Sequence, residues 1–443
     1  MSDTEKPIGV AVLGLGNVGR EVVRIIEESA ADLAARIGAP LELRGVAVRR
    51  VSGDRGVPVE MLTDNVEDLV SREDVDIVVE LMGPVEPARK AILTALEHGK
   101  SVVTANKALL AVHGTEIFEA AHRHGVMVAF EASVAGGIPI IKALREGLTA
   151  NRIQWIAGII NGTTNFILSE MRDKGLDFDV VLKEAQRVGY AEADPTFDIE
   201  GVGAAHKAAI MSAIAFGIPV QFDKAYVEGI THLAATDIRY AEQLGYRIKL
   251  LGITRRREGK GVELRVHPTL VPARRLIANV EGAMNAVVVN GDAVGTTLYY
   301  GKGAGSEPTA SAVIADLVDV TRLATSDPQH RVPHLAFQPG QMRDVSVLPM
   351  EDVVTGYYLR LRVADQAGVL ARVATILADA GISIDALLQR EADEVGGEGS
   401  TQTDLIILTH DAREGAMNAA LAELQGLPSV LAPIVRIRKE ELA

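Results

Sequence analysis

Four carboxylates lie within nine residues of one segment, Gly189 to Lys207, and the segment ends on a lysine. The four are Glu192, Asp194, Asp198 and Glu200. Carboxylates this close repel one another, and Pro195 interrupts a regular helix, so we predict an acidic loop that leads into a helix near Gly201. Such a segment is suited to bind a cation or to move a proton, and the alternative is a solvated loop.

The elements that would position this segment begin with a nucleotide-binding pattern. An apolar strand is predicted at Ile8 to Leu13, and Gly14-Leu15-Gly16-Asn17-Val18-Gly19 and a helical pattern follow. In such a fingerprint the first glycine makes a tight turn, the second admits pyrophosphate, and the third lets helix and strand pack closely. Pyrophosphate then lies at the helix N-terminus. We therefore predict a dinucleotide site at Gly14, Gly16, Asn17, Val18 and Gly19, with an ordinary strand-to-helix turn as the alternative.

The second predicted strand, Leu41 to Val48, ends in Arg49 and Arg50. Sites that are specific for NAD usually carry an acidic residue here, which binds the ribose 2′-hydroxyl. Two arginines suit a 2′-phosphate instead. The sequence therefore favours NADP and leaves NAD open.

Further strands and helices alternate along the first third of the chain. The strands are predicted at Val75 to Leu81, Ser101 to Thr104 and Val126 to Ala129, and the helices at Pro87 to Glu97 and Gly114 to Arg123. This alternation predicts a parallel, doubly wound sheet, in which ligands bind beyond the carboxyl ends of the strands. Thr104-Ala105-Asn106-Lys107 falls at such an end. Lys107 is therefore a candidate active-site residue, and a solvated surface lysine is the alternative.

Composition limits the classes of partner. The 443 residues include 45 Lys and Arg against 59 Asp and Glu, so the formal charge is −14, which disfavours nucleic acid and anionic membranes. The chain has no cysteine, which excludes disulfides, thiol nucleophiles and cysteine-bound metals. No apolar run approaches the roughly 18 residues that span a bilayer, and the N-terminus does not resemble a signal peptide. We expect about two to four domains in a cytoplasmic protein.

Two polar segments follow the first domain. Glu131 to Pro139 is rich in small residues, and the backbone carbonyls of such a turn are possible ligands for a hard cation. A strand is predicted at Arg152 to Ile160, and Asn161-Gly162-Thr163-Thr164-Asn165 is predicted to be a loop. This loop is expected to cap a helix that begins near Phe166, to line a pocket, or to do both.

These residues together resemble homoserine dehydrogenase, and four blocks occur in that family's order. The blocks are Gly14 to Gly19, Thr104 to Lys107, Asn161 to Asn165, and Gly189 to Lys207. The resemblance extends to about residue 325, and unrelated dehydrogenases share only the first block. It implies an NAD(P)-dependent oxidoreductase that interconverts L-aspartate 4-semialdehyde and L-homoserine.

The resemblance also implies roles for single residues. Lys207 matches the lysine that donates a proton to the carbonyl oxygen, and Lys107 and Glu192 match residues that hold the substrate. The other implied contacts are Tyr190, Asp198 and Glu307 for substrate, and Thr104, Lys107 and Gly303 for cofactor. The oxygens implied to bind a structural sodium ion belong to Glu131, Val134, Gly136 and Ile138.

One position departs from the family pattern Asp-x-x-Gly-x-Asp-x-x-x-Lys. The chain supplies Asp198, Gly201 and Lys207, but Gly203 stands where the second aspartate belongs. Residues four apart share one helix face, so this carboxylate would lie within reach of the lysine. We expect a chain that binds cofactor but turns over weakly. The alternative is a catalytically degenerate, amino-acid-sensing regulatory protein on the same fold.

A third domain is predicted after a proline-containing linker that follows Asp327-Pro328. Strands are expected at 357–363, 382–389, 403–409 and 430–437, helices at 368–380 and 412–424, and a hairpin at 391–400. The order βαββαβ is ferredoxin-like. With Asp365-Gln366-Ala367-Gly368 at its first strand-to-helix turn, the domain resembles an ACT domain, which binds amino acids. A structural appendage is the alternative.

The expected architecture therefore has four parts. Residues 1–135 with about 300–330 form the doubly wound dinucleotide-binding domain, 136–299 an α+β substrate-binding and dimerisation domain, 331–354 a linker, and 355–443 the ACT domain. L-threonine is the expected effector, and a homodimer or homotetramer is the expected assembly.

Overall fold

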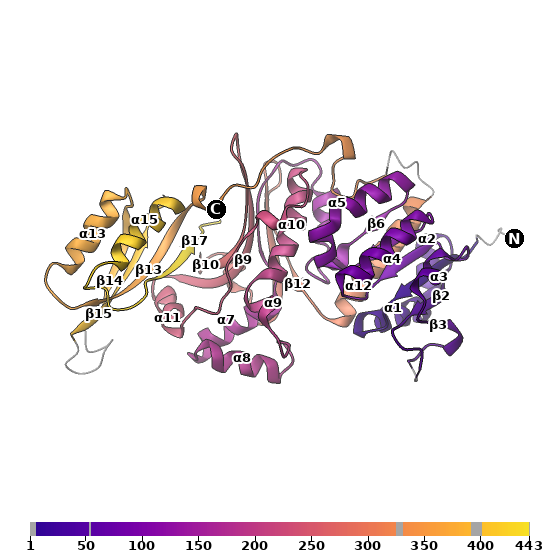
Figure 1. The fold of residues 1–443 in the computed structure, drawn as a ribbon, viewed down its shortest axis with the longest axis horizontal. Coiled ribbons are helices and arrows are strands. Elements are labelled where there is room, and N and C mark those ends of the chain that lie inside the picture. Colours follow the sequence, from indigo (N-terminus) through magenta and orange to yellow (C-terminus); the bar gives the residue numbers. More distant parts are fainter. Residues whose placement is uncertain (1–5, 53–54, 325–330, 391–400, 443) are drawn as a thin grey trace. The chain divides into compact units, whose positions relative to one another are not determined.

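The structure is a computed structural model, and it describes residues 6–52, 55–324, 331–390 and 401–442. The chain divides into two compact units. Figure 1 labels its helices and strands. Unit 1 comprises residues 1–156, 203–223 and 284–345, and unit 2 comprises 157–202, 224–283 and 346–443. Strand β7 (Ile153–Ile159) and helix α10 (Val202–Phe216) contain points at which the chain passes from one unit to the other.

Unit 1 contains a parallel sheet with the strand order β3-β2-β1-β4-β5-β6. Its strands are β1 (Ile8–Leu13), β2 (Leu41–Ala47), β3 (Leu62–Thr63), β4 (Ile77–Glu80), β5 (Ser101–Thr104) and β6 (Val128–Ala129). The central strands are almost wholly buried, because helices cover both faces of the sheet. The predicted doubly wound sheet is confirmed. The predicted bounds are confirmed for β1 and β5, whereas β2, β4 and β6 are shorter than predicted.

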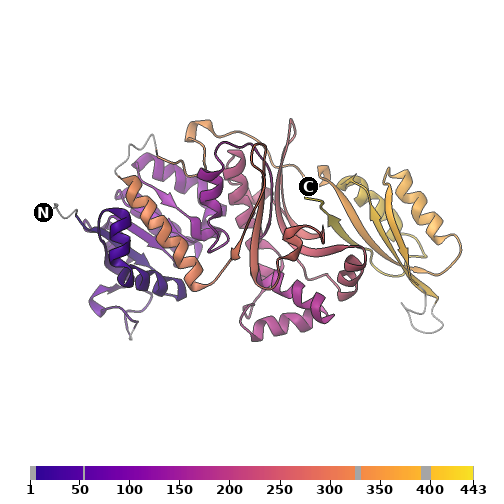
Figure 2. The ribbon, with the colours of Figure 1, turned by 180° about the vertical axis from the view of Figure 1, so that it is seen from behind.

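The helices of unit 1 form two groups around the sheet. The helices are α1 (Asn17–Glu28), α2 (Ala30–Ile37), α3 (Val66–Ser71), α4 (Val85–Glu97), α5 (Lys107–His124), α6 (Ile140–Lys142) and α12 (Ser306–Ala324). Helix α12 packs on α1 and α2, although it comes from late in the sequence (Figure 2). Helices α4 and α5 pack on each other. Unit 1 also contains the antiparallel pair β11 (Met284–Gly291) and β12 (Gly295–Lys302).

Unit 2 is built on a second, mixed sheet. Strands β9 (Tyr246–Arg257) and β10 (Gly261–Pro272) pair antiparallel along their whole lengths. Strand β17 (Val435–Lys439) then pairs parallel with β10 and antiparallel with β13 (Val354–Ala364). The remaining elements include β8 (Tyr226–Val227), α7 (Gly162–Lys174), α8 (Phe178–Arg187), α9 (Thr196–Ile199) and α11 (Ala235–Gln243).

The C-terminal part of unit 2 confirms the predicted βαββαβ order. After β13 come α13 (Val369–Asp379), β14 (Ile384–Gln389), β15 (Gln402–Thr409), β16 (Ala412–Arg413), α15 (Glu414–Gln425) and β17. Buried residues of α13 and α15 join those of β13 and β15 in one hydrophobic core. The last strand begins at Val435, five residues later than predicted. The predicted hairpin at 391–400 and Asp327-Pro328, after which the linker is predicted, lie outside the described residues.

No helix within the described part of the chain is long and apolar enough to cross a membrane.

Candidate active site

The three fingerprint glycines in unit 1 occupy three different environments. Gly14 has a φ of +102°, and a Cβ there would lie 2.7 Å from the Leu81 carbonyl oxygen. A Cβ on Gly19 would lie 2.1 Å from the Gly14 carbonyl oxygen, so helix α1 contacts the turn closely. A Cβ on Gly16 would meet nothing within 4 Å. The loop is therefore tight at both ends and open at Gly16, as a bound pyrophosphate requires.

The surroundings of this loop suit an anion. Asn17 and Val18 begin α1, whose first turn contains no acidic residue. Arg49 and Arg50 are both exposed just after β2. A hollow of about 440 Å³ lies beside the loop, and its lining includes Leu15, three arginines (Arg20, Arg24 and Arg55) and two glutamates (Glu27 and Glu28). Arginines therefore lie on the side of the loop where the adenosine end of a dinucleotide binds in this fold, although Glu27 and Glu28 line the same hollow.

A buried carboxylate, Glu80, organises the carboxyl ends of β4 and β5. It is fully buried, and it accepts hydrogen bonds from the Met82 N–H and from the Thr104 hydroxyl, each at 2.7 Å. Burial raises the pKa of Glu80. Thr104 Oγ1 in turn accepts from the Asn106 N–H at 3.0 Å. Glu80 thus connects the loops that follow β4 and β5, and its only signal in the sequence is an acidic side chain at the end of an apolar strand.

Asn106 places Lys107 at the start of α5. Its side chain caps the helix by accepting the Leu109 N–H at 3.1 Å, and its Nδ2 donates to the Gly83 carbonyl at 3.1 Å. The predicted helix at 114–123 is therefore only the second half of α5. Burial, and then the charge of Lys107, lower the pKa of His206 to about 4. His206 lies on α10, the helix that also carries Lys207 and the buried Gly203.

The predicted cation turn has two unusual backbone positions. Ala135 has a φ of +57° and Gly136 a φ of +49°, and Glu131 to Ser133 form a 3-10 turn instead of an open loop. The Glu131 carboxylate accepts the Ile141 and Lys142 N–H groups at 2.9 and 2.8 Å. Its oxygens are thus used at the N-terminus of α6. No group of three or more His, Cys, Asp or Glu among the described residues is arranged to hold a metal ion.

Asp316 of α12 holds this turn from inside the protein. Its Oδ2 accepts the Glu131 N–H at 2.8 Å. Burial, together with the nearby charge of Glu131, raises the pKa of Asp316 to about 7. The sequence analysis missed this residue. Its signal was a lone carboxylate on the apolar face of a helix.

Gly303 and Glu307 lie close to other candidate residues of unit 1. A Cβ on Gly136 would lie 2.6 Å from the Gly303 carbonyl oxygen, so the two backbones touch. Glu307 lies in the first turn of α12, 3.4 Å from the Arg24 guanidinium of α1, and its side chain is 76% exposed. The late segment therefore reaches both the cation turn and the fingerprint helix.

In unit 2, the 161–165 block holds the Asp198 carboxylate by hydrogen bonds. The Asn161 amide donates to Asp198 Oδ1 at 2.8 Å, and the Thr163 hydroxyl lies 3.0 Å from Oδ2. Asn161 also caps α7 by accepting the Thr164 N–H at 2.8 Å. The prediction that this block caps a helix is correct, but the helix begins at Gly162 and not near Phe166. Two of the recognised blocks therefore meet through side chains.

Tyr190 and Glu192 precede Asp198 in the same segment. The Tyr190 carbonyl lies 2.8 Å from the Thr163 hydroxyl, and the Tyr190 ring packs on Phe166 with centroids 4.5 Å apart. The Tyr190 side chain is 49% exposed, and Glu192 is also exposed. The predicted acidic loop is therefore anchored at Tyr190 and Asp198, and it presents the Glu192 carboxylate to solvent.

Family models match most of the chain. Residues 14–131 match the NAD binding domain of homoserine dehydrogenase, residues 139–318 match homoserine dehydrogenase, and residues 357–427 match the ACT domain. The homoserine dehydrogenase of Pseudomonas aeruginosa is 56% identical over 437 residues, which cover 99% of this chain and 100% of the relative.

Solved structures agree with these matches. The crystal structure of a homoserine dehydrogenase from Thiobacillus denitrificans has a TM-score of 0.93 and 62% identity, with 99% of each chain covered. A hyperthermophilic archaeal homoserine dehydrogenase in complex with NADPH has a TM-score of 0.61 and 28% identity, and covers 71% of this chain and 98% of its own. These findings support a dehydrogenase and not a sensor protein. The chain therefore belongs to the homoserine dehydrogenase family, as an oxidoreductase with a nucleotide-binding domain and a C-terminal ACT domain.

Proposed function

We propose that the chain interconverts L-aspartate 4-semialdehyde and L-homoserine with NADP as the preferred cofactor. The observation that carries this proposal is that Asn161 and Thr163 both donate hydrogen bonds to the Asp198 carboxylate. These hydrogen bonds join the two blocks that other dehydrogenases lack. The relatives' shared name and the NADPH complex of the archaeal relative support the same substrate and cofactor.

The candidate residues have complementary tasks in this proposal. When bound at the fingerprint loop, the cofactor supplies the hydride that reduces the aldehyde carbon. Lys207 Nζ donates the proton that the carbonyl oxygen takes up, which is general acid catalysis and typically contributes about 10² to 10⁴ in rate. Lys107, Glu192, Tyr190 and Asp198 bind and orient the amino acid. Glu307 and Gly303 complete the pocket.

The test is NADPH oxidation with aspartate semialdehyde as substrate. We expect activity in the parent chain and a loss of at least about 100-fold in kcat for Lys207→Met. Lys183→Met, which alters an exposed lysine of α8, is the control and should leave kcat unchanged. A parent chain with no aldehyde-dependent oxidation would contradict the proposed function.

The cofactor preference rests on Arg49 and Arg50. An arginine beside the ribose stabilises a 2′-phosphate and contributes nothing comparable to a 2′-hydroxyl. Replacing both with alanine should therefore lower kcat/KM for NADPH while changing kcat/KM for NADH little. Equal losses for both cofactors would show that the arginines do not select the 2′-phosphate.

A sodium ion at the 131–138 turn belongs to the same proposal. The left-handed backbone at Ala135 and Gly136 turns successive carbonyls, and carbonyl oxygens are suitable ligands for a hard cation. The buried carboxyl groups of Glu131 and Asp316 lie beside this turn. Sodium titration of the metal-free chain, followed by thermal unfolding, should raise Tm where the same concentration of a large organic cation does not.

Regulation by an amino acid, with L-threonine as the first candidate, is also part of the proposal. The first strand-to-helix turn of the ACT domain borders a hollow of about 290 Å³, and its lining includes Asp365, Gln366, Gly368, Gln389 and Thr403. Calorimetry should detect threonine binding to the parent and weaker binding to Gln366→Ala. The homo-oligomeric assembly and the cytoplasmic location stay predictions from the sequence.

A further inference from the structure

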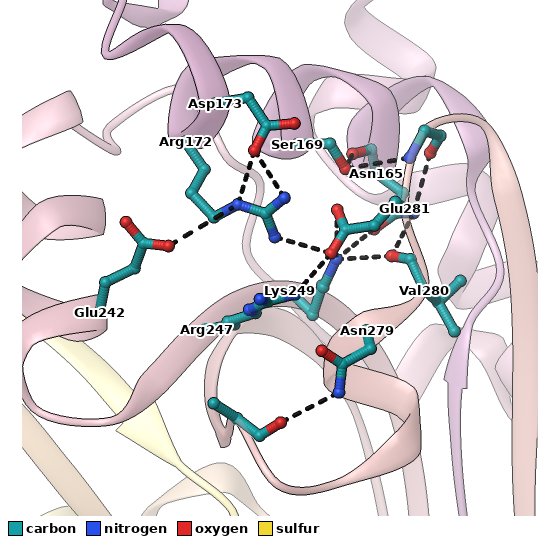
Figure 3. Close-up of polar contacts among 12 residues, drawn as sticks. Asn165, Ser169, Arg172, Asp173, Glu242, Arg247, Lys249, Asn279, Val280 and Glu281 are labelled. Carbon is teal, nitrogen blue, oxygen red and sulfur yellow. Dashed lines mark hydrogen bonds and ion pairs between the residues drawn. The ribbon is translucent and has the colours of Figure 1, made fainter.

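A second polar cluster holds helix α7, and none of the catalytic roles above uses it. We call it the α7 clamp (Figure 3). It consists of Asn165, Ser169 and Arg172 of α7, Arg247 and Lys249 of β9, and residues 280–282, which precede β11. All of these residues belong to unit 2.

The α7 side of the clamp is one helix face. Residues 165, 169 and 172 are spaced by four and three, so their side chains point the same way. Asn165 Nδ2 donates to the carbonyls of Val280 and Gly282 at 3.0 and 2.8 Å, and Ser169 Oγ accepts the Gly282 N–H at 3.1 Å. Arg172 Nη1 donates to Glu281 Oε1 at 2.7 Å (Figure 3). Segment 280–282 is therefore attached to α7 by both backbone and side chain.

Lys249 lies at the centre of the clamp, and its side chain is only 2% exposed. Its ammonium donates to the Val280 carbonyl at 2.6 Å and to Asn165 Oδ1 at 3.3 Å, and lies 3.7 Å from Glu281 Oε2. Burial lowers the pKa of Lys249 to about 8, against the opposing charge of Glu281. A buried ammonium is tolerated only where such partners replace water.

The charged groups that face Lys249 come from three elements. Glu281 contributes the negative charge, while Arg172 of α7 and Arg247 of β9 contribute positive charge and both bind Glu281 Oε1. Arg172 is in turn paired with Asp173 and lies 3.8 Å from Glu242 of α11. Of these charges, the Glu281 carboxylate favours the ammonium form of Lys249, and the two arginines oppose it.

The clamp is adjacent to the first turn of α7, where Asn161 and Thr163 hydrogen-bond Asp198. A Cβ on Gly162 would lie 2.8 Å from the Ala283 carbonyl oxygen, so the first turn of α7 touches the residue that follows segment 280–282. Asn161 and Thr163, on either side of Gly162, bind Asp198. A shift of segment 280–283 therefore shifts the groups that position the Asp198 carboxylate and the Tyr190 carbonyl.

We propose that Lys249 is a positioning residue for the substrate-binding segment, acting through Asn165, segment 280–283 and the first turn of α7. The inference rests on the proposed function in assigning that segment to the substrate. It predicts that Lys249 sets the affinity for homoserine and leaves cofactor binding and the hydride-transfer step unchanged.

The direct test compares Lys249→Met with Lys174→Met, which alters an exposed lysine on the same helix α7 as Asn165. Homoserine binding to the NADPH complex, in which it cannot be oxidised, is measured by calorimetry. Lys249→Met should weaken homoserine binding about tenfold, a loss of roughly 1.4 kcal/mol at 25 °C. The variant should leave kcat and the Kd of NADP within about twofold of the parent. Lys174→Met should match the parent. Unchanged homoserine affinity in Lys249→Met, or equal losses for substrate and cofactor, would overturn the proposal.

A pH profile separates positioning from simple structural support. In the parent, homoserine affinity should fall as the pH rises through about 8, because Lys249 loses its proton. Glu281→Gln removes the charge that favours the ammonium, so the midpoint should move to lower pH, and Lys249→Met should show no such transition. If Lys249→Met does not fold, the Glu281→Gln midpoint decides, and an unmoved midpoint refutes the proposal. Failure of the proposed function would appear differently, as a parent that neither binds nor oxidises homoserine.

Discussion

Gly203 is the second residue of α10, one helical turn before Lys207. An aspartate at this position would place a carboxylate on the same helix face as the lysine. Glycine at this position removes that charge. The family match establishes the fold and the class of enzyme, and this one residue bears on how fast the enzyme works.

Gly203→Asp should raise kcat by about tenfold or more, because a carboxylate orients the general acid and the benefit falls within the range of general acid catalysis. The Kd of NADP should not change, since the fingerprint loop is untouched. Steady-state rates of aspartate semialdehyde reduction measure the effect. Equal kcat values for variant and parent would show that this chain does not need the aspartate.

Asp316 gives unit 1 a pH-dependent stability. Its pKa rises from 3.8 to about 7 on folding, so between these values the folded chain binds more protons than the unfolded chain. The free energy of unfolding therefore falls as the pH rises through this window. Asp316→Asn keeps an acceptor for the Glu131 N–H and removes the titration.

Relative to the parent, Asp316→Asn should gain stability on the order of 2 kcal/mol as the pH is raised from about 4 to 8. Chemical denaturation in sodium-free buffer measures this gain. Asp32→Asn, at an exposed site on α2, is the control and should follow the parent. Parallel pH profiles for parent and Asp316→Asn would contradict the assignment.

At the scale of elements, the bounds of some strands could be predicted from the sequence, whereas the starts of two helices could not. Strands such as β1 and β5 were placed correctly because their apolar runs are continuous and end in polar turns. Helices α5 and α7 begin earlier than predicted, because Asn106 and Asn161 cap them with side chains that also bind elsewhere, at Gly83 and Asp198. These long-range bonds carry no sequence pattern, and neither do the buried partners Glu80 and Lys249.

Asn106→Ala should lower stability by about 1 kcal/mol, because it removes the cap of α5. It should also lower kcat/KM, because Lys107 begins this helix and the bond to Gly83 is lost. Asn65 caps α3 by accepting the Asp68 N–H, so Asn65→Ala is a matched control that should cost similar stability without lowering kcat/KM. Thermal unfolding and steady-state kinetics distinguish the two. Equal kinetic losses would show that the cap does not position Lys107.

At the scale of the whole molecule, the C-terminal ACT domain shares one sheet with strands β9 and β10. Strand β17 pairs with both β10 and β13. Arg265 of β10 is fully buried and ion-paired with Glu263 and Glu440, and Arg438 of β17 is paired with Glu228 and Glu414. The sequence predicted the ACT fold correctly, but a separate pattern for each domain could not reveal strands paired across their boundary.

Deletion of the residues after 345 removes the ACT domain, and it should therefore also destabilise strands β9 and β10. It leaves the buried Arg265 without Glu440, and loss of one partner of a buried ion pair typically costs about 3 to 5 kcal/mol. Hydrogen exchange of β9 and β10 should increase sharply in the truncated chain. A truncated chain with parent-like exchange and homoserine affinity would contradict this expectation.

The shared sheet also affects the order in which the protein is completed on the ribosome. Strand β17 is synthesised about 160 residues after β10. At typical translation rates of about 5 to 20 residues per second, the edge of β10 waits roughly 10 to 30 s for its neighbour. During this time Arg265 of β10 lacks its partner Glu440. An unpaired strand edge is also a template for misassembly. Chains that stall before residue 435 therefore lack the strand that pairs with β10.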